Sequence, residues 1–215
     1  MWKNNLPLFK VMTGVGLSFW IMLEFHVQMF GGGLALTLSA FLWIFAGASY
    51  THFFEYFHHR VPMHRGIPGF IFLRNAHDIH HRVFAGSRFQ QAVVANPQTL
   101  ISRWWIFPML FVIHYGLALL VLPRAYVPSF FVGVCFHYAI FELSHWFTHL
   151  QDNWYDRIML RIPLIGRIRK KQILHHRIHH QFPLVRFNFN PPYLGDRIFR
   201  TMDPKRFIKK INNSA

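Results

Sequence analysis

The segment SFFVGVCFHYAIFELSHWFTH, residues 129–149, decides the expected fold because it joins a long apolar stretch to a metal-binding pattern. A helix needs about 20 apolar residues to cross a bilayer, and residues 129–147 meet that length. Three further stretches are comparably apolar, at about 11–29, 34–57 and 104–122. None of the four has the single charged face that helices of a soluble bundle carry. The sequence therefore predicts an all-α fold with a four-helix transmembrane bundle.

The composition limits the class of protein further. Of 215 residues, 53% are hydrophobic and 14% are charged, a balance that disordered chains do not have. The single cysteine excludes a disulfide scaffold and any cysteine-rich zinc or iron–sulfur site. The formal net charge of +15 is high for so few charged residues, so its distribution along the chain needs an explanation.

Basic residues predict how the bundle is oriented. Residues 1–10, 58–103 and 150–215 hold 22 of the 23 basic residues, and Arg124 is the remaining one. The positive-inside rule makes those three segments cytosolic. We therefore expect a multi-pass integral membrane protein of the endoplasmic reticulum or a bacterial inner membrane, with both termini cytosolic. No nucleic-acid-binding motif accompanies the charge, so nucleic acid is not an expected partner.

Residues 58–103 and 148–215 are expected to form a cytosolic helical cap. Within it, residues 152–171 mix apolar residues with six basic ones. This pattern fits an interfacial stretch, broken at Pro163, that binds the anionic headgroups of membrane lipids. It fits equally well a segment whose charge only retains it in the cytosol. The basic residues are Arg157, Arg161, Arg167, Arg169, Lys170 and Lys171.

Histidine is the most informative residue type, with 16 copies against 8 acidic residues. Ten histidines fall into four motifs, in the order H-x4-H, H-x-x-H-H, H-x-x-x-H and H-x-x-H-H. Residues at i, i+3 and i+4 share one face of a helix, so the last three motifs can each converge. Pro62 interrupts any helix in the first motif, so we expect its second histidine to lie beyond a bend. The ten are His59, His64, His77, His80, His81, His145, His149, His176, His179 and His180.

Such a cluster favours a metal site in the cytosolic cap. Protonated imidazoles would repel one another, and neutral ones would leave nitrogens unpaired, whereas a metal removes both problems. Ten nitrogens exceed the four of a zinc site and suit two ions. Imidazole binds iron, zinc, copper and nickel alike, but zinc has no redox chemistry. We therefore expect two iron ions, with zinc possible in the isolated protein.

The four motifs, in this order, resemble the fatty acid hydroxylase / sterol desaturase superfamily of membrane di-iron enzymes over residues 52–203. The nearest likeness is to fatty acid 2-hydroxylases, whose Tyr-Asp-x-x-His-Tyr-x-x-His, Gly-Phe-Gly and Trp-Asp-x-x-Phe-x-Thr segments correspond to residues 141–149, 188–190 and 195–201. The chain departs from that pattern at four positions, and it has no His-Pro-Gly-Gly heme-ligand motif of a fused cytochrome b5 domain. The departures are Glu142 for Asp, Asn188 and Asn190 for glycines, and Gly195 for Trp.

The resemblance implies that the ten histidines hold two irons. It also implies that the enzyme hydroxylates the acyl chain of a lipid entering from the bilayer, using O2 and electrons from a separate cytochrome b5- or ferredoxin-like donor. A desaturase, or another oxidase of a sterol-like or carotenoid lipid, would use the same centre. A histidine-rich membrane metal carrier is the alternative from another class.

Two carboxylates are candidates for roles beside the metals. Glu142 lies three residues before His145 and shares its helical face, so it would hold an imidazole tautomer or bridge the metals. A capping or snorkelling glutamate is the simpler reading. Asp196 would pair with a ligand histidine or with Arg197, or it is an ordinary loop residue.

The remaining six histidines form two sets. His52, His58 and His175 neighbour the motifs and are candidates for supporting or substitute ligands. His59 is preferred to His58 because it has the spacing of the family. The other three lie inside the predicted spans, where a hydrogen-bonded structural role is expected. They are His26, His114 and His137.

Overall fold

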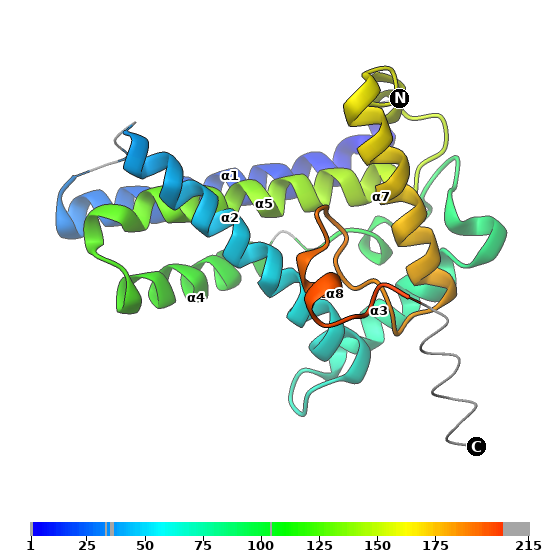
Figure 1. The fold of residues 1–215 in the computed structure, drawn as a ribbon, viewed down its shortest axis with the longest axis horizontal. Helices are drawn as coiled ribbons and strands as arrows, with labels where there is room; N and C mark the ends of the chain where they lie inside the picture. Colours follow the sequence, from blue (N-terminus) through cyan, green and yellow to red (C-terminus); the bar gives the residue numbers. More distant parts are fainter. Residues whose placement is uncertain (1, 33, 35–36, 104, 204–215) are drawn as a thin grey trace. The chain divides into compact units, whose positions relative to one another are not determined.

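The computed structural model describes residues 2–32, 34, 37–103 and 105–203, and these form helices and loops without a strand (Figure 1). The all-α prediction is confirmed. The chain divides into two compact units, the first made of 1–51 with 101–143 and the second of 52–100 with 144–215.

The first unit contains four helical segments. They are α1 (Trp2–Phe30), the first part of α2 (Leu38–His58), α4 (Ile106–Val121) and, after the short turn η4 (Arg124–Tyr126), most of α5 (Val127–Thr148). Helices α2 and α5 each continue into the second unit.

Hydrogen bonds between histidine and tyrosine side chains join these helices. His26 Nδ1 on α1 lies 2.7 Å from the hydroxyl of Tyr115 on α4. The His114 ring lies between two hydroxyls, with Nδ1 2.9 Å from Tyr50 on α2 and Nε2 2.8 Å from Tyr138 on α5. Both histidines are buried. The structural role predicted for His26 and His114 is therefore confirmed.

Two glycines allow α2 and α5 to approach closely. A Cβ atom at Gly47 would collide with the backbone carbonyl of Phe130, and one at Gly133 would collide with the carbonyl of Ile44. Small residues allow this kind of backbone contact between apolar helices. The α2–α5 crossing therefore depends on the absence of a side chain at both positions.

Each of the four predicted spans contains a helix over most of its length, but only two described helices are long and apolar enough to cross a membrane. These are Leu6–Phe30 and Arg124–Thr148. Helix α4 has 16 residues, which is about 24 Å at 1.5 Å per residue and shorter than a bilayer core. Helix α2 contains polar residues in its second half and does not reach the same hydropathy. The predicted cytosolic termini (residue 1 and 204–215) and residue 104, where the third span was expected to begin, lie outside the described residues.

The second unit carries shorter helices around the ends of α2 and α5. Figure 1 shows α3, α7 and α8 of this unit. Its elements are η1 (His59–Arg65), α3 (Ile71–Val83), η2 (Gly86–Phe89), η3 (Pro97–Thr99), α6 (Trp154–Met159), α7 (Pro163–Gln181) and α8 (Leu194–Ile198).

The elbow between α6 and α7 is closely packed. Pro163 is the first residue of α7, as the predicted break indicates, and proline is favoured there because a first-turn N–H has no helical partner. A Cβ atom at Gly166 would lie 2.8 Å from the carbonyl oxygen of Leu160. The buried Arg169 donates to Asp156 at 2.7 Å and fastens α7 to α6.

Candidate metal centre

Nine of the ten predicted ligand histidines form two groups in the second unit. Within each group, one ring nitrogen from every histidine lies within 4.8 Å of all the others. Buried histidine clusters that could hold a metal ion are therefore present. The first group contains His59, His64, His77, His81 and His179, and the second contains His80, His145, His149 and His176.

The spacing of the nitrogens fits ligands around an ion. In the first group, Nε2 of His77 lies 2.9 Å from Nε2 of His59 and 3.0 Å from that of His64. In the second, Nε2 of His176 lies 3.1 Å from His145 and 3.0 Å from His149. A metal–nitrogen distance of about 2.1 Å would place neighbouring ligand nitrogens about 3.0 Å apart at a right angle. The groups therefore have the size that a coordinated ion requires.

Main-chain carbonyls fix the tautomer of four of these histidines, two in each group. In the first group, Nδ1 of His59 donates to the carbonyl of Phe187 at 2.5 Å and Nδ1 of His179 to that of Val185 at 2.7 Å. In the second, His80 and His149 donate in the same way to carbonyls on η3 and η2, at 2.9 and 2.7 Å. An imidazole that carries its proton on Nδ1 presents a lone pair on Nε2. Each group therefore presents at least two Nε2 lone pairs that a cation would satisfy.

His180 lies at the border of the two groups. Its Nε2 is 3.0 Å from Nε2 of His80 and 3.1 Å from Nε2 of His176, both in the second group. Its ring stacks on His81 of the first group, with centroids 4.4 Å apart. All ten predicted ligands therefore belong to one continuous cluster.

Burial keeps these imidazoles neutral. Burial and the nearby His59 lower the pKa of His64 to about 2, and burial lowers the pKa of His80 to about 4. Burial together with neighbouring histidines also holds the pKa values of His77, His176 and His179 well below 6.5. Neutral imidazole is the form that binds metal.

The first motif converges by a route that the sequence did not predict. Residues 59–65 continue α2 as a π-helix that contains Pro62, and it ends at Gly66, whose N–H donates to Val61 at 2.9 Å. The expectation that proline places His64 beyond a bend is therefore wrong. A π-helix bonds i to i+5, which matches the spacing of five between His59 and His64. Their Nε2 atoms lie 3.3 Å apart.

Helix geometry divides the two H-x-x-H-H motifs between the groups. On α3, His77 and His81 are four residues apart and belong to the first group, whereas His80 belongs to the second. On α7, His179 belongs to the first group and His176 to the second. The sequence predicted a shared face for each of these two motifs, and the structure shows that each of them supplies both groups, whereas His145 and His149 both belong to the second group.

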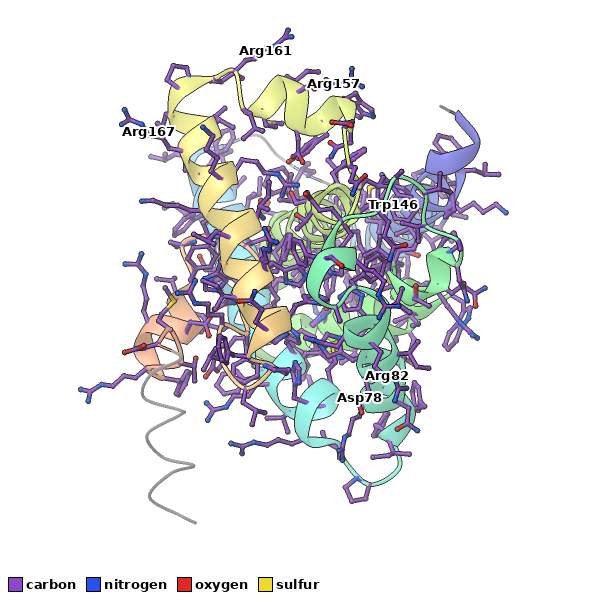
Figure 2. All side chains as sticks on the ribbon, turned by 90° about the vertical axis from the view of Figure 1, so that its right-hand side faces the viewer. Asp78, Arg82, Trp146, Arg157, Arg161 and Arg167 are labelled. Atoms are coloured by element: carbon purple, nitrogen blue, oxygen red, sulfur yellow. The ribbon has the colours of Figure 1, made fainter. Side chains whose placement is uncertain are left out.

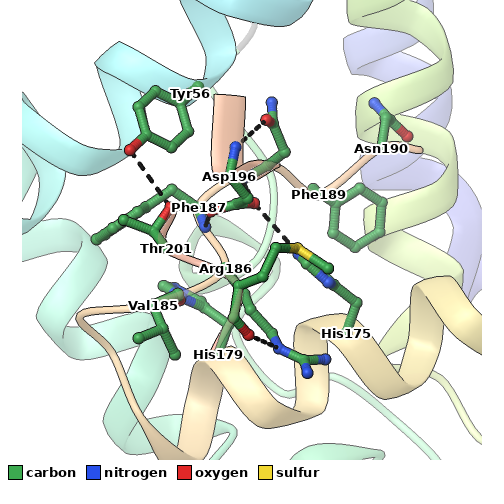
Figure 3. A network of polar contacts seen from close by, with 12 residues as sticks. Tyr56, His175, His179, Val185, Arg186, Phe187, Phe189, Asn190, Asp196 and Thr201 are labelled. Carbon is green, nitrogen blue, oxygen red and sulfur yellow. Dashed lines mark hydrogen bonds and ion pairs between the residues drawn. The ribbon is translucent and has the colours of Figure 1, made fainter. Parts of the chain in front are cut away.

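A segment after α7, residues 185–190, supports the first group and is held by Asp196 (Figure 3). The buried Asp196 carboxylate accepts the backbone N–H groups of Phe187 and Asn188, both at 2.8 Å, and the Thr201 hydroxyl at 2.6 Å. Its Oδ2 also lies 3.4 Å from Nε2 of His175. Asp196 thus contacts the segment whose carbonyls orient His59 and His179.

Glu55 on α2 holds the other half of this segment. Its carboxylate accepts the backbone N–H of Phe189 at 2.5 Å and that of Asn190 at 3.3 Å. Glu55 is not among the site residues predicted from the sequence. The sequence could have indicated Glu55, because an acidic residue inside an apolar stretch is rare and usually has a function.

Three of the departures from the family pattern lie in the same network. The Asn188 side chain donates to the carbonyl of His52 at 2.9 Å, and that of Asn190 accepts from Gln172 at 2.9 Å. At Gly195, a Cβ atom would collide with the ring of Tyr56. The asparagines therefore add hydrogen bonds, and the glycine makes room for an aromatic ring.

The two histidine groups do not include Glu142 or the three histidines that neighbour the motifs, His52, His58 and His175. Glu142 is buried in the first unit, 3.4 Å from the backbone N–H of Ser102, and its role toward His145 stays a prediction. His52 accepts the N–H of Leu194 at 3.1 Å, and His175 stacks on Tyr193 with centroids 4.0 Å apart. His58 stacks on Phe54. None of these three histidines belongs to either group of nitrogens described above.

Comparison with known proteins gives no relative from which to transfer a function. No family model, no curated protein and no solved structure matches the chain.

Proposed function

We propose that this chain is a membrane oxygenase of the fatty acid hydroxylase / sterol desaturase type, which holds two iron ions and hydroxylates the acyl chain of a lipid. O2 and electrons from a separate cytochrome b5- or ferredoxin-like donor would be its other reactants. The observation that carries the proposal is the pair of adjacent histidine groups, each presenting Nε2 lone pairs fixed by main-chain carbonyls. When bound, a pair of redox-active irons would supply the reduction of O2 and the insertion of oxygen into a C–H bond.

The residues of the chain would hold and shield the metals. The first group would bind one ion and the second group the other, with His180 at the border between them. Phe89 and Phe187 pack against ligand rings and keep water from them, with centroid distances of 4.8 Å to His149 and 5.9 Å to His59.

The rigidity of the groups favours an enzyme over a metal carrier. A carrier must release its ion, so its ligands need to move or to be reached by water. Here four ligands are fixed by main-chain carbonyls, all four histidines of the second group are buried, and those of the first group are buried or partly buried. Fixed coordination suits a resident cofactor whose surroundings must not reorganise during the reaction.

Exposed apolar residues of the first unit support a lipid environment and hence a lipid substrate. Phe45 on α2 and Leu120 and Val121 on α4 are 73%, 82% and 76% exposed. Large apolar surfaces of this kind on a monomer mark contact with membrane or partner. Together with the two helices that could cross a bilayer, they support a membrane location. The proposed four-helix bundle of the endoplasmic reticulum or a bacterial inner membrane, with the metal site in the cytosol, depends in addition on the apolar stretches and on the distribution of basic residues.

Metal analysis and lipid analysis of the same variants test the proposal. The full chain would be expressed with an electron donor in a host that lacks the activity, and its lipids compared by mass spectrometry. We expect about two irons per chain, with zinc replacing iron in some preparations, and lipids that have gained one oxygen atom. His59→Ala and His149→Ala, one from each group, should each remove metal and abolish the product.

His58→Ala is the matched control, since His58 precedes His59 and lies outside both groups. It should keep both metal and product. Retention of metal in His59→Ala and His149→Ala would refute the centre itself. Lipids that lose two hydrogens would replace hydroxylation by desaturation, and a loaded protein that changes no lipid would refute the activity alone.

A further inference from the structure

The elbow formed by α6 and the first half of α7, residues 154–171, exposes apolar and basic side chains together. Within it, Leu164 is 69% exposed and Ile158 is 52% exposed. Trp154, Leu160, Ile162, Ile165 and Ile168 are exposed as well. Soluble surfaces rarely gather so many large apolar residues in one short segment.

The structure separates the basic residues of this segment by role. Arg169 is buried against Asp156, so its charge is already neutralised. The other five are exposed, and Asp152 is the one exposed carboxylate of residues 152–171. The five are Arg157, Arg161, Arg167, Lys170 and Lys171. With five exposed cations against one exposed carboxylate, the elbow therefore presents a net positive charge.

The elbow lies beside the end of a helix that is long and apolar enough to cross a bilayer. Helix α5 is one of the two helices that could cross a bilayer, and its last turn contains Phe147. The Phe147 ring stacks on Tyr155 with centroids 5.0 Å apart and contacts Trp154 edge-on at 5.2 Å. Helix α6 thus packs on the C-terminal end of α5, where α5 would leave the hydrocarbon if it spans a bilayer.

Figure 2 shows Arg157, Arg161 and Arg167 projecting at the α6–α7 end of the second unit, away from Arg82 and Asp78 on α3. Long cationic side chains reach headgroup phosphates while neighbouring apolar side chains enter the acyl boundary. An acidic soluble protein would match the charge but would leave the exposed Leu164 and its apolar neighbours in contact with water or a polar surface.

We propose that the α6–α7 elbow is an interfacial anchor that binds anionic lipid headgroups, with its apolar side chains inserted at the headgroup–acyl boundary. The inference needs α5 to lie in a bilayer, and it does not depend on the oxygenase activity. If the chain proved to lack oxygenase activity, the proposed anchor would not be affected.

Spin labels on the full chain in lipid nanodiscs test the proposal. Cys135 is the only cysteine and is buried, so a Cys135→Ala background allows one label at Leu164→Cys and a reference label at Arg82→Cys. In phosphatidylcholine with phosphatidylglycerol, the label at 164 should collide more with O2 and less with a water-soluble paramagnetic chelate than the label at 82. At position 164, the collision rate with O2 divided by the collision rate with the chelate should fall about tenfold or more in Arg157→Gln/Arg161→Gln/Arg167→Gln.

The control variant Arg65→Gln/Arg82→Gln/Arg197→Gln removes three exposed charges elsewhere in the unit and should keep the wild-type ratio. Nanodiscs of phosphatidylcholine alone should show weaker insertion at 164 than those with phosphatidylglycerol. Equal chelate access at 164 and 82, or a dependence on phosphatidylglycerol that survives the triple substitution, would overturn the proposal. Protection of 164 only after addition of cytochrome b5 would assign the surface to a protein partner instead.

Discussion

Asp196 accepts the backbone N–H of Phe187 at 2.8 Å, and the carbonyl of the same Phe187 receives Nδ1 of His59 at 2.5 Å. One residue of backbone therefore links a buried carboxylate to the orientation of a candidate metal ligand. Hydrogen-bond partners of ligand histidines set the ring orientation and the basicity of the bound nitrogen. Asp196 would act on a bound metal through the backbone of Phe187, as a positioning residue.

Asp196→Asn should weaken metal binding without removing a ligand. An amide cannot accept from both N–H groups of the segment as a carboxylate does, so His59 would lose its fixed carbonyl. We expect metal affinity to fall by about 10–100-fold, measured by competition with a chromophoric chelator. Asp78→Asn is the control, because Asp78 forms only an exposed pair with Arg74 and such pairs contribute little. Equal affinities in the two variants would contradict the positioning role.

Glu55→Gln should act on the same segment and should not add to Asp196→Asn. Both carboxylates hold residues 187–190. Loss of either one should already free much of this segment, so loss of the second should have a smaller additional effect. We expect the double variant to lose less affinity than the sum of the single losses, in free energy. The measurement is a double-mutant cycle of metal affinity, with Glu24→Gln as the exposed glutamate control. Strict additivity would show that the two carboxylates act on different elements.

Acid should destabilise the metal-free protein. Burial lowers the pKa of His64 to about 2 and of His80 to about 4, whereas in the unfolded chain both titrate near 6.5. Below about pH 6.5 the unfolded state binds more protons than the folded state, so the free energy of unfolding falls as the pH falls. The stabilisation from these neutral histidines is fully present only above that pH. Thermal unfolding of chelator-treated protein between about pH 8 and pH 5 would measure this. A flat profile would mean that the histidines are not neutral in the folded protein.

Gly133→Ala should destabilise the first unit. The added methyl group would meet the backbone carbonyl of Ile44, which cannot move without shifting α2. We expect a loss of about 1–3 kcal/mol in the free energy of unfolding, as for other overpacked sites. Gly116→Ala on α4 is the matched control, because no atom lies within 4 Å of a Cβ there, and it should keep or slightly raise the stability. Thermal unfolding in detergent compares the two, and equal losses would argue against a close α2–α5 contact.

Arg169→Gln should destabilise the second unit far more than Arg167→Gln. Removing the buried guanidinium would leave the Asp156 carboxylate without its partner at 2.7 Å, and breaking such a buried pair costs about 3–5 kcal/mol. Arg167 is exposed, so its loss should change stability by less than about 0.5 kcal/mol. Denaturant unfolding distinguishes the two, and a similar effect of both would show that Arg169 is not structural.

Periodicity and spacing predicted the features that depend on local geometry. The four apolar stretches are helices, and the histidines at i, i+3 and i+4 converge because a helix places such residues on one face. The break at Pro163 was also readable, since proline favours the first turn of a helix. The π-helix at 59–65 could not be predicted in this way, because proline usually interrupts a helix and Pro62 lies inside this one.

The sequence by itself determined that this protein is helical and that ten histidines lie in four motifs able to bind metal. Only the tertiary structure decided how nine of the ten divide into two groups, because α3 and α7 each supply ligands to both. It also selected the carbonyls of Phe187, Val185, Thr99 and Phe89 as histidine partners. Every residue has a carbonyl, so no side-chain pattern marks which one will face an imidazole. That choice depends on packing between segments that are distant in the chain.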